Sequence, residues 1–140
     1  MKFQFGKPCQ TTQIVSNTRA FYKDIAKQFC NEYYYAYDTE FKSLLKFYNN
    51  KSVFTFCEEE FLNFETLNNR LVNYYMVNSF KHDINKIDAQ PVGEKGILIT
   101  IVGTVKVNNL HHDQDFVETI LLEENKDNVM FVINTIFRVF

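Results

Sequence analysis

Histidine and carboxylate pairs are the residues of this sequence whose types could support metal binding or acid–base chemistry. They occur twice, as His111-His112-Asp113 and as His82-Asp83. Neighbouring residues on a strand point to opposite faces, so the two adjacent histidines could not hold one ion together. A zinc site needs further ligands, and none lies nearby in the sequence. The pattern therefore predicts solvated loops, and we expect no metal and no cofactor.

A group of phenylalanines beside an acidic run could instead recognise a partner protein. Phe54 and Phe56 precede the run Glu58-Glu59-Glu60, and Phe61 follows it. The rings could border an aromatic pocket for a partner's phenylalanine, or they could be plain core, where such residues are usually found. The acidic run could meet a basic partner, or it could form a solvated hairpin turn. The candidate partner-binding residues are Phe54, Phe56, Glu58 and Phe61.

Arg138 is an isolated charge in an otherwise apolar strand, where it follows Phe137. A buried or interfacial charge without a partner is costly, so Arg138 is expected to pair with a carboxylate. The candidate carboxylates are Asp88, Glu118 and Asp115. The pair would either brace the fold or hold a dimer partner in register. Asp88, Phe137 and Arg138 are therefore the candidate structural or dimer residues.

The hydrophobic pattern predicts the elements that must position these residues. Apolar residues recur every four positions from Phe21 to Tyr33, which is typical of an amphipathic helix. Residues 1–16 show no clear period and form an arm, with Phe3 and Phe5 available to dock. The predicted elements are the helix Asn17–Ala36, the helix Glu40–Tyr48, the turn Asn49–Lys51, the strands Ser52–Cys57 and Phe61–Phe64, the helix Glu65–Val77 and the strand Lys81–Gln90.

The stretch Gly96–Phe140 predicts a three-stranded antiparallel meander. Its three β-branched, alternating runs are separated by two polar connections. Within Ile97–Val107 one face is wholly apolar and the other is mixed. In the last strand both faces are apolar, and strict alternation places Ile133 and Phe137 on the same face. An antiparallel sheet that meets water on one side shows polar residues there. One face therefore needs helices and the other a second cover, for which we expect another copy of the sheet.

Length and composition restrict the class of protein. A chain of 140 residues with 46% apolar residues forms one globular domain with a sizeable core. The net charge of −2 does not favour direct binding to nucleic acid or to an anionic membrane. No apolar run is long enough to span a bilayer, and no signal peptide is expected. The three cysteines are widely spaced and odd in number, which favours a reducing compartment over a disulfide framework.

Five segments, taken in their order, resemble the nuclear transport factor 2 family. The resemblance covers about Thr18 to Phe140, which is nearly the whole chain. Its most specific parts are Val102-Gly103 in mid-strand and the closing Phe137-Arg138. The five segments are Phe29–Tyr34, Leu44–Tyr48, Phe54–Phe56 with the acidic turn and Phe61, Ile87–Pro91 running into Ile101–Lys106, and Asp115–Leu122 with Ile133–Arg138.

The resemblance implies an α+β, cone-like fold in residues 17–140, with a strongly bent antiparallel sheet enclosing about three helices. It also implies dimerisation through the outer face of the sheet. Family members that act in transport carry protein or mRNA cargo through nuclear pores by binding phenylalanine-glycine repeats of nucleoporins. The expected protein is therefore a non-enzymatic adaptor of the nucleus and cytoplasm that acts at the nuclear pore.

The resemblance leaves several branches of the family open. One branch is a homodimer that imports Ran-GDP, but this chain lacks the residues with which that branch contacts Ran. It has Phe56 where the branch has a tryptophan, Cys57 where it has a glutamate, and Asn108 and Leu110 where it has an acidic pair. Lost charges at a desolvated ion pair are costly. A second branch forms a heterodimer with a large mRNA export receptor, and Gly103–Val107 looks closest to it. A third is the interaction domain of stress-granule proteins. We favour an export-type or general transport role.

The same scaffold also hosts enzymes such as ketosteroid isomerases, in which a buried carboxylate abstracts a proton. Asp83 and Asp88 would be candidates for that carboxylate, with Tyr33, Tyr34 and Tyr75 as hydrogen-bond donors. No nucleophile motif and no phosphate-binding loop occurs in the sequence. We therefore expect no catalytic residues.

Overall fold

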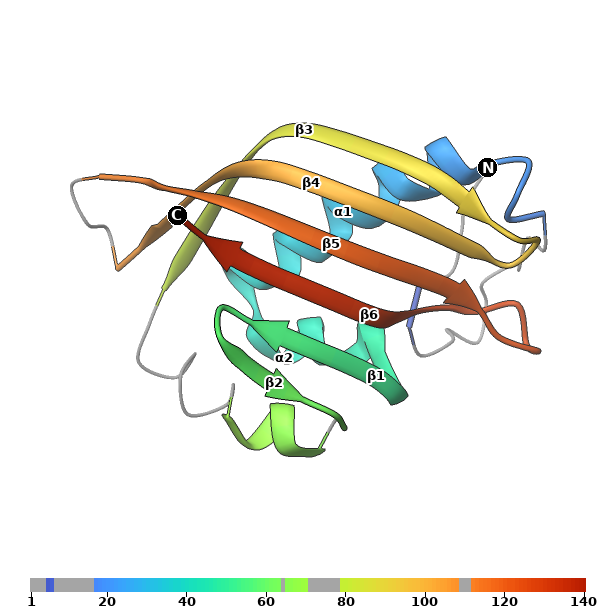
Figure 1. Ribbon diagram of the computed structural model, residues 1–140, viewed down its shortest axis with the longest axis horizontal. Coiled ribbons are helices and arrows are strands. Elements are labelled where there is room, and N and C mark those ends of the chain that lie inside the picture. The colour runs from blue at the N-terminus through green and yellow to red at the C-terminus, as the bar shows by residue number, and fades with distance from the viewer. Residues whose placement is uncertain (1–4, 7–16, 64, 71–78, 109–111) are drawn as a thin grey trace.

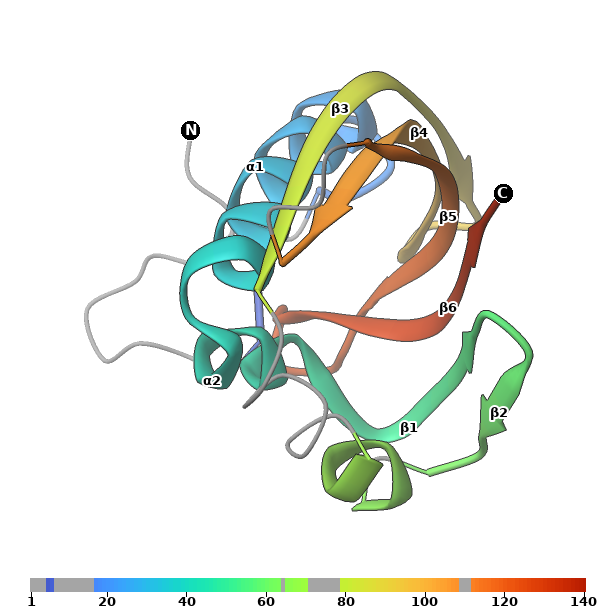
Figure 2. The same ribbon diagram turned by 90° about the vertical axis from the view of Figure 1, so that its left-hand side faces the viewer.

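The computed structural model describes residues 5–6, 17–63, 65–70, 79–108 and 112–140. In this part the chain forms a curled sheet of six strands that does not close, with helices on its inner side (Figures 1 and 2). The predicted α+β class and cone-like shape are therefore confirmed. No helix within the described ranges is long and apolar enough to cross a membrane.

The helices come first in the chain. Helix α1 spans Tyr22–Thr39, α2 spans Phe41–Leu44, and the 3-10 turn η1 spans Leu45–Phe47. The long helix begins five residues later than predicted and ends three residues later. It continues because its buried stripe continues through Ala36 and Tyr37. The second predicted helix is wrong at its end, because Tyr48 already belongs to the first strand.

The sheet has the strand order β2-β1-β6-β5-β4-β3. Strands β3 to β6 form the predicted meander and the strand before it, and all of their pairings are antiparallel. Strand β1 joins the free side of β6 in a parallel pairing. The six strands are β1 Tyr48–Phe56, β2 Glu59–Phe61, β3 Phe80–Val92, β4 Gly96–Val107, β5 Gln114–Glu124 and β6 Met130–Val139.

A bulge in β6 corrects the predicted faces of that strand. Leu121 pairs with Asn134, but Leu122 pairs with Val132, so Ile133 is an extra residue. A shift of one residue moves every later side chain to the other face. Phe137 consequently faces the core and is buried, whereas Ile133 does not share its face.

The first hairpin also differs from the prediction. The predicted turn Asn49–Lys51 lies inside β1, as an irregularity in its pairing with β6. The Asn49 side chain stabilises this irregularity, because its Oδ1 accepts a hydrogen bond from the Lys51 N–H at 2.9 Å. The Ser52 hydroxyl donates to the Val132 carbonyl at 2.6 Å. Strand β2 begins at Glu59, so only Cys57 and Glu58 form the turn.

The inner face of the sheet and α1 share one hydrophobic core. The predicted apolar face of β4 is buried at Ile97, Ile99 and Ile101, and α1 contributes aromatic rings such as Phe29 and Tyr33. Residues 65–70 are helical, as predicted for that part of Glu65–Val77, and the rest of that helix lies outside the described residues. Phe5 of the predicted arm is buried in the same core, whereas Phe3 lies outside the described residues.

We predict that Gly103→Ala destabilises the fold by about 1 to 3 kcal/mol, which is the usual cost of an overpacked site. A Cβ at this position would overlap the carbonyl oxygen of Asp83 on β3, and it would also press on the Phe116 ring. The denaturant midpoint checks this. Asp83→Ala is the matched control, because it removes an exposed side chain but keeps the backbone oxygen, and it should change stability by less than about 0.5 kcal/mol. Equal effects of the two variants would refute the packing argument.

Candidate functional site

A hollow of about 530 Å³ lies beside the turn between β1 and β2, and we call it the β1–β2 hollow. It brings together three residues that the sequence analysis singled out separately, namely Phe56, Glu58 and Arg138. Charged groups of both signs surround its aromatic floor. Its lining consists of Phe56, Cys57, Glu58, Glu59, Arg70, Arg138 and Val139.

The floor of this hollow is the outer end of a stack of aromatic rings. Phe56 is half-buried, and its ring is stacked on Phe137 with the centroids 5.2 Å apart and an angle of 9° between the planes. Phe137 is stacked in turn on Phe116 at 5.4 Å. Offset stacks of this kind add about 0.5 to 1.5 kcal/mol per pair beyond simple burial. A partner's aromatic side chain could therefore extend a stack that the core already holds rigid.

The other two candidate phenylalanines are core residues. Phe54 and Phe61 face each other across the β1–β2 pairing, and both are buried. The Phe54 ring meets the Tyr48 ring edge-on at 4.7 Å. The structure thus places Phe56 in the lining of the hollow and the other two in the core.

The charges at the rim of the hollow are partly paired. Arg70 binds Glu59 with two hydrogen bonds of 3.0 and 3.1 Å, and this contact lowers the pKa of the Glu59 carboxyl. Glu58 is exposed in the turn. Arg138 is also exposed, and it forms no ion pair with any described residue. Within the described ranges neither Arg138 nor Glu58 has an ion-pair partner, so the rim carries two exposed charges of opposite sign.

Arg138 does not pair within the subunit with the carboxylates that the sequence suggested. Asp88 lies on β3, and two strands separate β3 from β6. At the usual strand spacing this amounts to about 14 Å. Glu118 points to the opposite, concave face, where it is buried. Asp115 shares the outer face, but it is only a diagonal neighbour of Arg138 and forms no ion pair with it.

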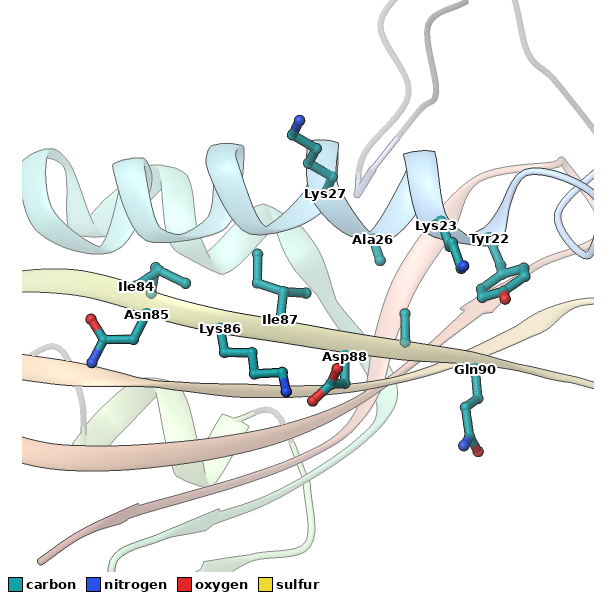
Figure 3. Close-up of a pocket in the computed structure, with 11 residues that line it drawn as sticks. Tyr22, Lys23, Ala26, Lys27, Ile84, Asn85, Lys86, Ile87, Asp88 and Gln90 are labelled. Atoms are coloured by element: carbon teal, nitrogen blue, oxygen red, sulfur yellow. The ribbon is translucent and has the colours of Figure 1, made fainter.

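Asp88 borders a second and larger hollow of about 1000 Å³, which lies between α1 and β3. In Figure 3, Ile84 and Ile87 point from β3 toward the helix, whereas Lys86 and Asp88 point to the other side of the strand. The second side places Asp88 on the outer face of the sheet, next to Thr100 of β4. Asp88 is thus an exposed outer-face residue, as a contact with another subunit would require.

The interior of the cone holds a buried carboxylate that the sequence analysis did not single out as a site. Glu118 is 2% exposed, and both of its oxygens accept hydrogen bonds. The Tyr34 hydroxyl donates to Oε1 at 2.6 Å, and the Thr135 hydroxyl donates to Oε2 at 2.6 Å. The group therefore links α1 to β5 and β6. A sequence signal existed, because Glu118 occupies an inward position between the buried Phe116 and Ile120.

Burial raises the pKa of the Glu118 carboxyl above its ordinary value, although the hydrogen bonds from Thr135 and Tyr34 act in the opposite direction. Burial followed by the nearby Glu118 charge raises the pKa of Tyr34 and of Tyr33. The same two causes raise the pKa of the Cys30 thiol to about 12. A thiol with such a pKa stays protonated and unreactive at neutral pH.

A histidine–aspartate pair lies beside this carboxylate. His82 Nδ1 is 2.6 Å from Asp38 Oδ1, and the backbone N–H of His82 donates to Asp38 Oδ2 at 2.9 Å. His82 Nε2 is buried without a hydrogen-bond partner in the described part of the chain. The pair joins the end of α1 to β3, so its evident role is structural. Asp83 and Asp88, the carboxylates considered for catalysis, are both exposed instead.

The remaining histidines form no site in the described structure. His112 is exposed, and His111 lies outside the described residues, as do Tyr75 and Leu110. Asp113 lies 3.6 Å from Lys106 in an exposed ion pair. Among the described residues, no group of three His, Cys, Asp or Glu side chains is arranged to hold a metal ion.

The outer face of the sheet carries a set of apolar side chains, which we call the convex patch. The register aligns Leu98 with Leu121, and Val102 with Val117, while Ile136 lies opposite Thr119 on the next strand. Leu98, Val102 and Ile136 are exposed, and the last is 50% exposed. Exposed apolar side chains that gather on one sheet face make that face a candidate interaction surface.

Comparisons with known proteins agree with this architecture. A model of the nuclear transport factor 2 (NTF2) domain matches residues 25–139. Nuclear transport factor 2 of Neurospora crassa is 28% identical over 114 residues, which cover 81% of this chain and 91% of the relative. The structure of nuclear transport factor 2 from Cryptosporidium parvum matches with a TM-score of 0.78 at 22% identity, covering 91% of this chain and 100% of the other. Yeast UBP3-associated protein BRE5 matches with a TM-score of 0.75 at 24% identity, covering 85% and 96%.

We predict that Glu118→Gln makes stability less dependent on pH. A carboxyl whose folded pKa is raised adds stability below its unfolded value of about 4.5, and this stability is lost as the pH rises toward the folded pKa. Glutamine keeps the shape of the side chain but does not titrate. Urea unfolding at pH 4 and pH 7 gives the free energy of unfolding of both proteins. From pH 4 to pH 7 the variant should become more stable relative to the wild type, by about 1.4 kcal/mol per unit of pKa shift. The exposed neighbour Glu123→Gln is the control, and parallel pH curves for all three proteins would contradict the prediction.

Proposed function

The chain belongs to the nuclear transport factor 2 family, and from this premise we propose that it is a non-enzymatic adaptor in nucleocytoplasmic transport. In this proposal the protein dimerises through its convex patch and binds the phenylalanine-glycine repeats of nucleoporins. It acts in the nucleus and cytoplasm at the nuclear pore, on protein or mRNA cargo. The fold alone does not assign a chemistry, so the proposal rests on the surfaces described above.

The convex patch is the observation that carries the proposal. Burying apolar surface contributes roughly 25 cal/mol per Å², and a stable interface buries about 800 Å² on each partner. Helices already fill the concave side of the sheet, so no described element of the same chain covers the patch. A second copy of the sheet supplies a surface of matching curvature and chemistry, as a two-fold dimer requires.

The unpaired charges at the two sides of the patch fit this arrangement. A two-fold axis along the strands would place β6 of one subunit over β3 of the other. The strand register places Arg138 level with Lys86 of β3 and Ile136 level with Asp88. Arg138 would then lie diagonal to Asp88 of the partner subunit, about 7 Å along the strand, which the long arginine side chain can reach. Such pairs mainly set register and specificity rather than affinity.

The β1–β2 hollow is the proposed contact for a partner's phenylalanine. Its floor, Phe56, is half-buried and already stacked on Phe137. Arg138 belongs both to this hollow and to the outer face, so the hollow lies at the margin of the proposed dimer seam. A shallow contact of this kind releases its ligand quickly, which suits transit through a pore, because affinity is mostly set by the dissociation rate.

Two other transport roles remain as distinct outcomes. In a Ran-GDP carrier, Glu58 would contact the basic surface of Ran. In a heterodimer subunit, the convex patch would instead face a large mRNA export receptor. A pull-down of the purified chain against Ran-GDP, nucleoporin repeats and such a receptor separates these roles, and capture of the receptor alone would replace the homodimer in the proposal.

We predict that Ile136→Lys converts the dimer to a monomer. The substitution places a charge in the middle of a surface that must lose its water, which typically costs several kcal/mol. Size-exclusion chromatography with light scattering at micromolar concentration measures the mass directly. Leu62→Lys is the matched control, because Leu62 is 75% exposed but lies outside the patch. A wild-type protein that is already monomeric would refute the proposed dimer.

A charge exchange tests the register of the same dimer. Arg138→Glu should weaken the dimer, and the double variant Arg138→Glu with Asp88→Lys should restore it by re-forming the pair in the opposite sense. Asp88→Lys should be made both in the wild type and in the Arg138→Glu variant. If it changes the dimer affinity equally in both, the two residues do not meet, and the axis along the strands is wrong.

We predict that Phe56→Ala weakens binding of a nucleoporin phenylalanine-glycine peptide by about 3- to 10-fold, because it removes the floor on which the ring would stack. Fluorescence anisotropy with a labelled peptide measures the affinity. Tyr35→Ala removes an exposed ring from α1 and should leave it unchanged. Undetectable peptide binding by the wild type and by variants that retain the fold would overturn the proposed function.

A further inference from the structure

The ring of Phe5, in the arm before the first helix, is part of the hydrophobic core. It is 4% exposed, and its ring centroid lies 5.5 Å from that of Phe29 on α1. Its backbone forms a single parallel bridge with Met130, at the start of β6. Strand β5 pairs with Met130 on the other side, so Phe5 extends the sheet there by one residue.

The residue after Phe5 must be a glycine. The Gly6 N–H donates to the Met130 carbonyl at 2.7 Å, and Gly6 has φ +69°, in the left-handed region. A Cβ at this position would overlap the carbonyl oxygen of Lys46 in η1. Any other residue would have to move away from the bridge. The site therefore selects a phenylalanine followed by a glycine.

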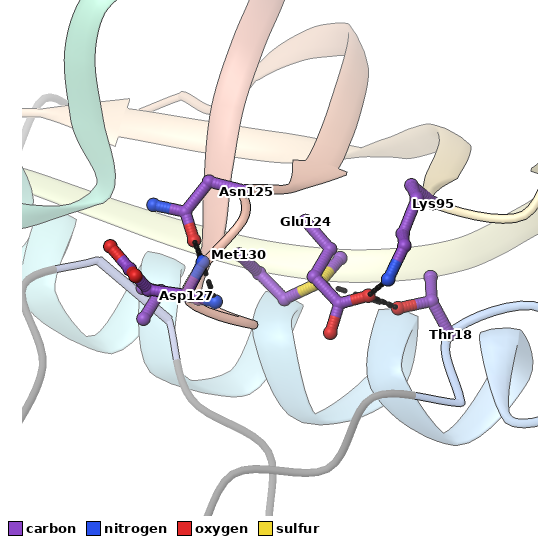
Figure 4. A network of polar contacts seen from close by, with 7 residues as sticks. Thr18, Lys95, Glu124, Asn125, Asp127 and Met130 are labelled. Atoms are coloured by element: carbon purple, nitrogen blue, oxygen red, sulfur yellow. Dashed lines mark hydrogen bonds and ion pairs between the residues drawn. The ribbon is translucent and has the colours of Figure 1, made fainter.

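The walls of this site are Phe29, Lys46 and Met130, and we call them the Phe5 socket. Glu124 is buried beside Met130, and it accepts from the Thr18 hydroxyl at 3.1 Å and from Lys95 Nζ at 3.0 Å. Figure 4 shows Glu124 between these two donors, with Met130 alongside. All three walls lie within the family match at residues 25–139, whereas Phe5 and Gly6 precede it.

We propose that the Phe5 socket is a second binding site for phenylalanine-glycine peptides, and that the chain's own Phe5-Gly6 occupies it until a partner's repeat displaces it. The proposal rests on the proposed function, because it uses the same class of ligand. The contacts described for Phe5 and Gly6 are the burial of the ring, the main-chain hydrogen bond to Met130 and the close approach that excludes a Cβ. A phenylalanine-glycine peptide supplied in trans carries its own ring, backbone N–H and glycine, so it can reproduce these contacts.

The tether makes this site a gated one. Residues 7–16 connect Gly6 to the start of the described domain, so the internal ligand is always present at a high effective concentration. The apparent affinity for an external peptide is reduced by the fraction of molecules whose socket is open. If the arm fills about nine sockets in ten, its removal strengthens binding of the external peptide about tenfold.

The experiment compares the full-length wild type with Phe5→Ala and, separately, with Gly6→Ala. The probe is a labelled peptide of the chain's own sequence Lys2–Pro8, titrated by fluorescence anisotropy, with a second peptide in which glycine is replaced by alanine as the control. We expect both variants to bind the first peptide about tenfold more tightly than the wild type and to bind the control peptide weakly. Adding Phe56→Ala should not abolish this gain, because Phe56 lies on β1 beside Phe137, near the end of β6, whereas the socket lies at the start of β6.

Two further readouts separate a binding site from a merely structural role. The peptide should raise the melting temperature of Phe5→Ala more than that of the wild type, because the socket is empty in the variant and filled by Phe5 in the wild type. The Met130 methyl resonance should shift on binding, and it can be assigned with Met130→Leu because the chain has three methionines.

The outcomes distinguish this inference from the proposed function. Equal peptide affinity in the wild type and both variants, with an unmoved Met130 signal, would overturn the gated socket while leaving adaptor function intact. Loss of all phenylalanine-glycine binding in every protein would overturn both. A lower melting temperature of Phe5→Ala that the peptide does not restore would show that the arm only completes the core, and would also overturn the inference.

Discussion

The bend of the sheet around α1 is the constraint on which the other features depend. A sheet that encloses a helix must bury one face completely, and here the inner residues of β4 and β5 do so. Bulges in β3 and β6 supply the local twist that the bend requires. Hydrogen bonds from Tyr34 and Thr135 to Glu118 then fix the helix to the sheet. Because the described helices of the cone lie on the inside, the outer face of the sheet has no described helix over it.

The same bend separates two aromatic sites along β6. Phe137, near the end of the strand, supports the ring of Phe56 at the β1–β2 hollow. Met130, at its start, supports Phe5. Phe56 is half-buried and Phe5 is buried, and each contacts rings of the core, so a ligand at either proposed site would order few additional side chains. A buried carboxylate between them costs stability, and both of its oxygens are bonded within the fold, so its position fits a structural tie better than a reacting group.

Much of the fold could be predicted from the sequence, because alternation and helical periodicity are local signals. The meander, the long helix and the apolar inner face of β4 follow from them, and the resemblance to the family supplied the cone. The bulge at Ile133 could not be predicted, since a single inserted residue leaves the apolar pattern intact while it reverses the faces. Glu118 was visible as an inward charge, but its partner Thr135 depends on that same bulge. The docking of Phe5 at Met130 joins residues far apart in the chain, and no local pattern encodes such a contact.

A tethered phenylalanine-glycine segment changes which partners a transport adaptor can bind. A single external peptide must compete with a ligand that is never more than a short tether away, so isolated repeats bind weakly. A partner that carries many repeats supplies a comparable local concentration and can displace the arm. In the proposed gate, repeat density rather than the chemistry of one repeat decides which partner displaces the arm, since both ligands use the same contacts. Under the proposed function, this discrimination would let the protein ignore scattered phenylalanine-glycine dipeptides and respond to a pore lined with them.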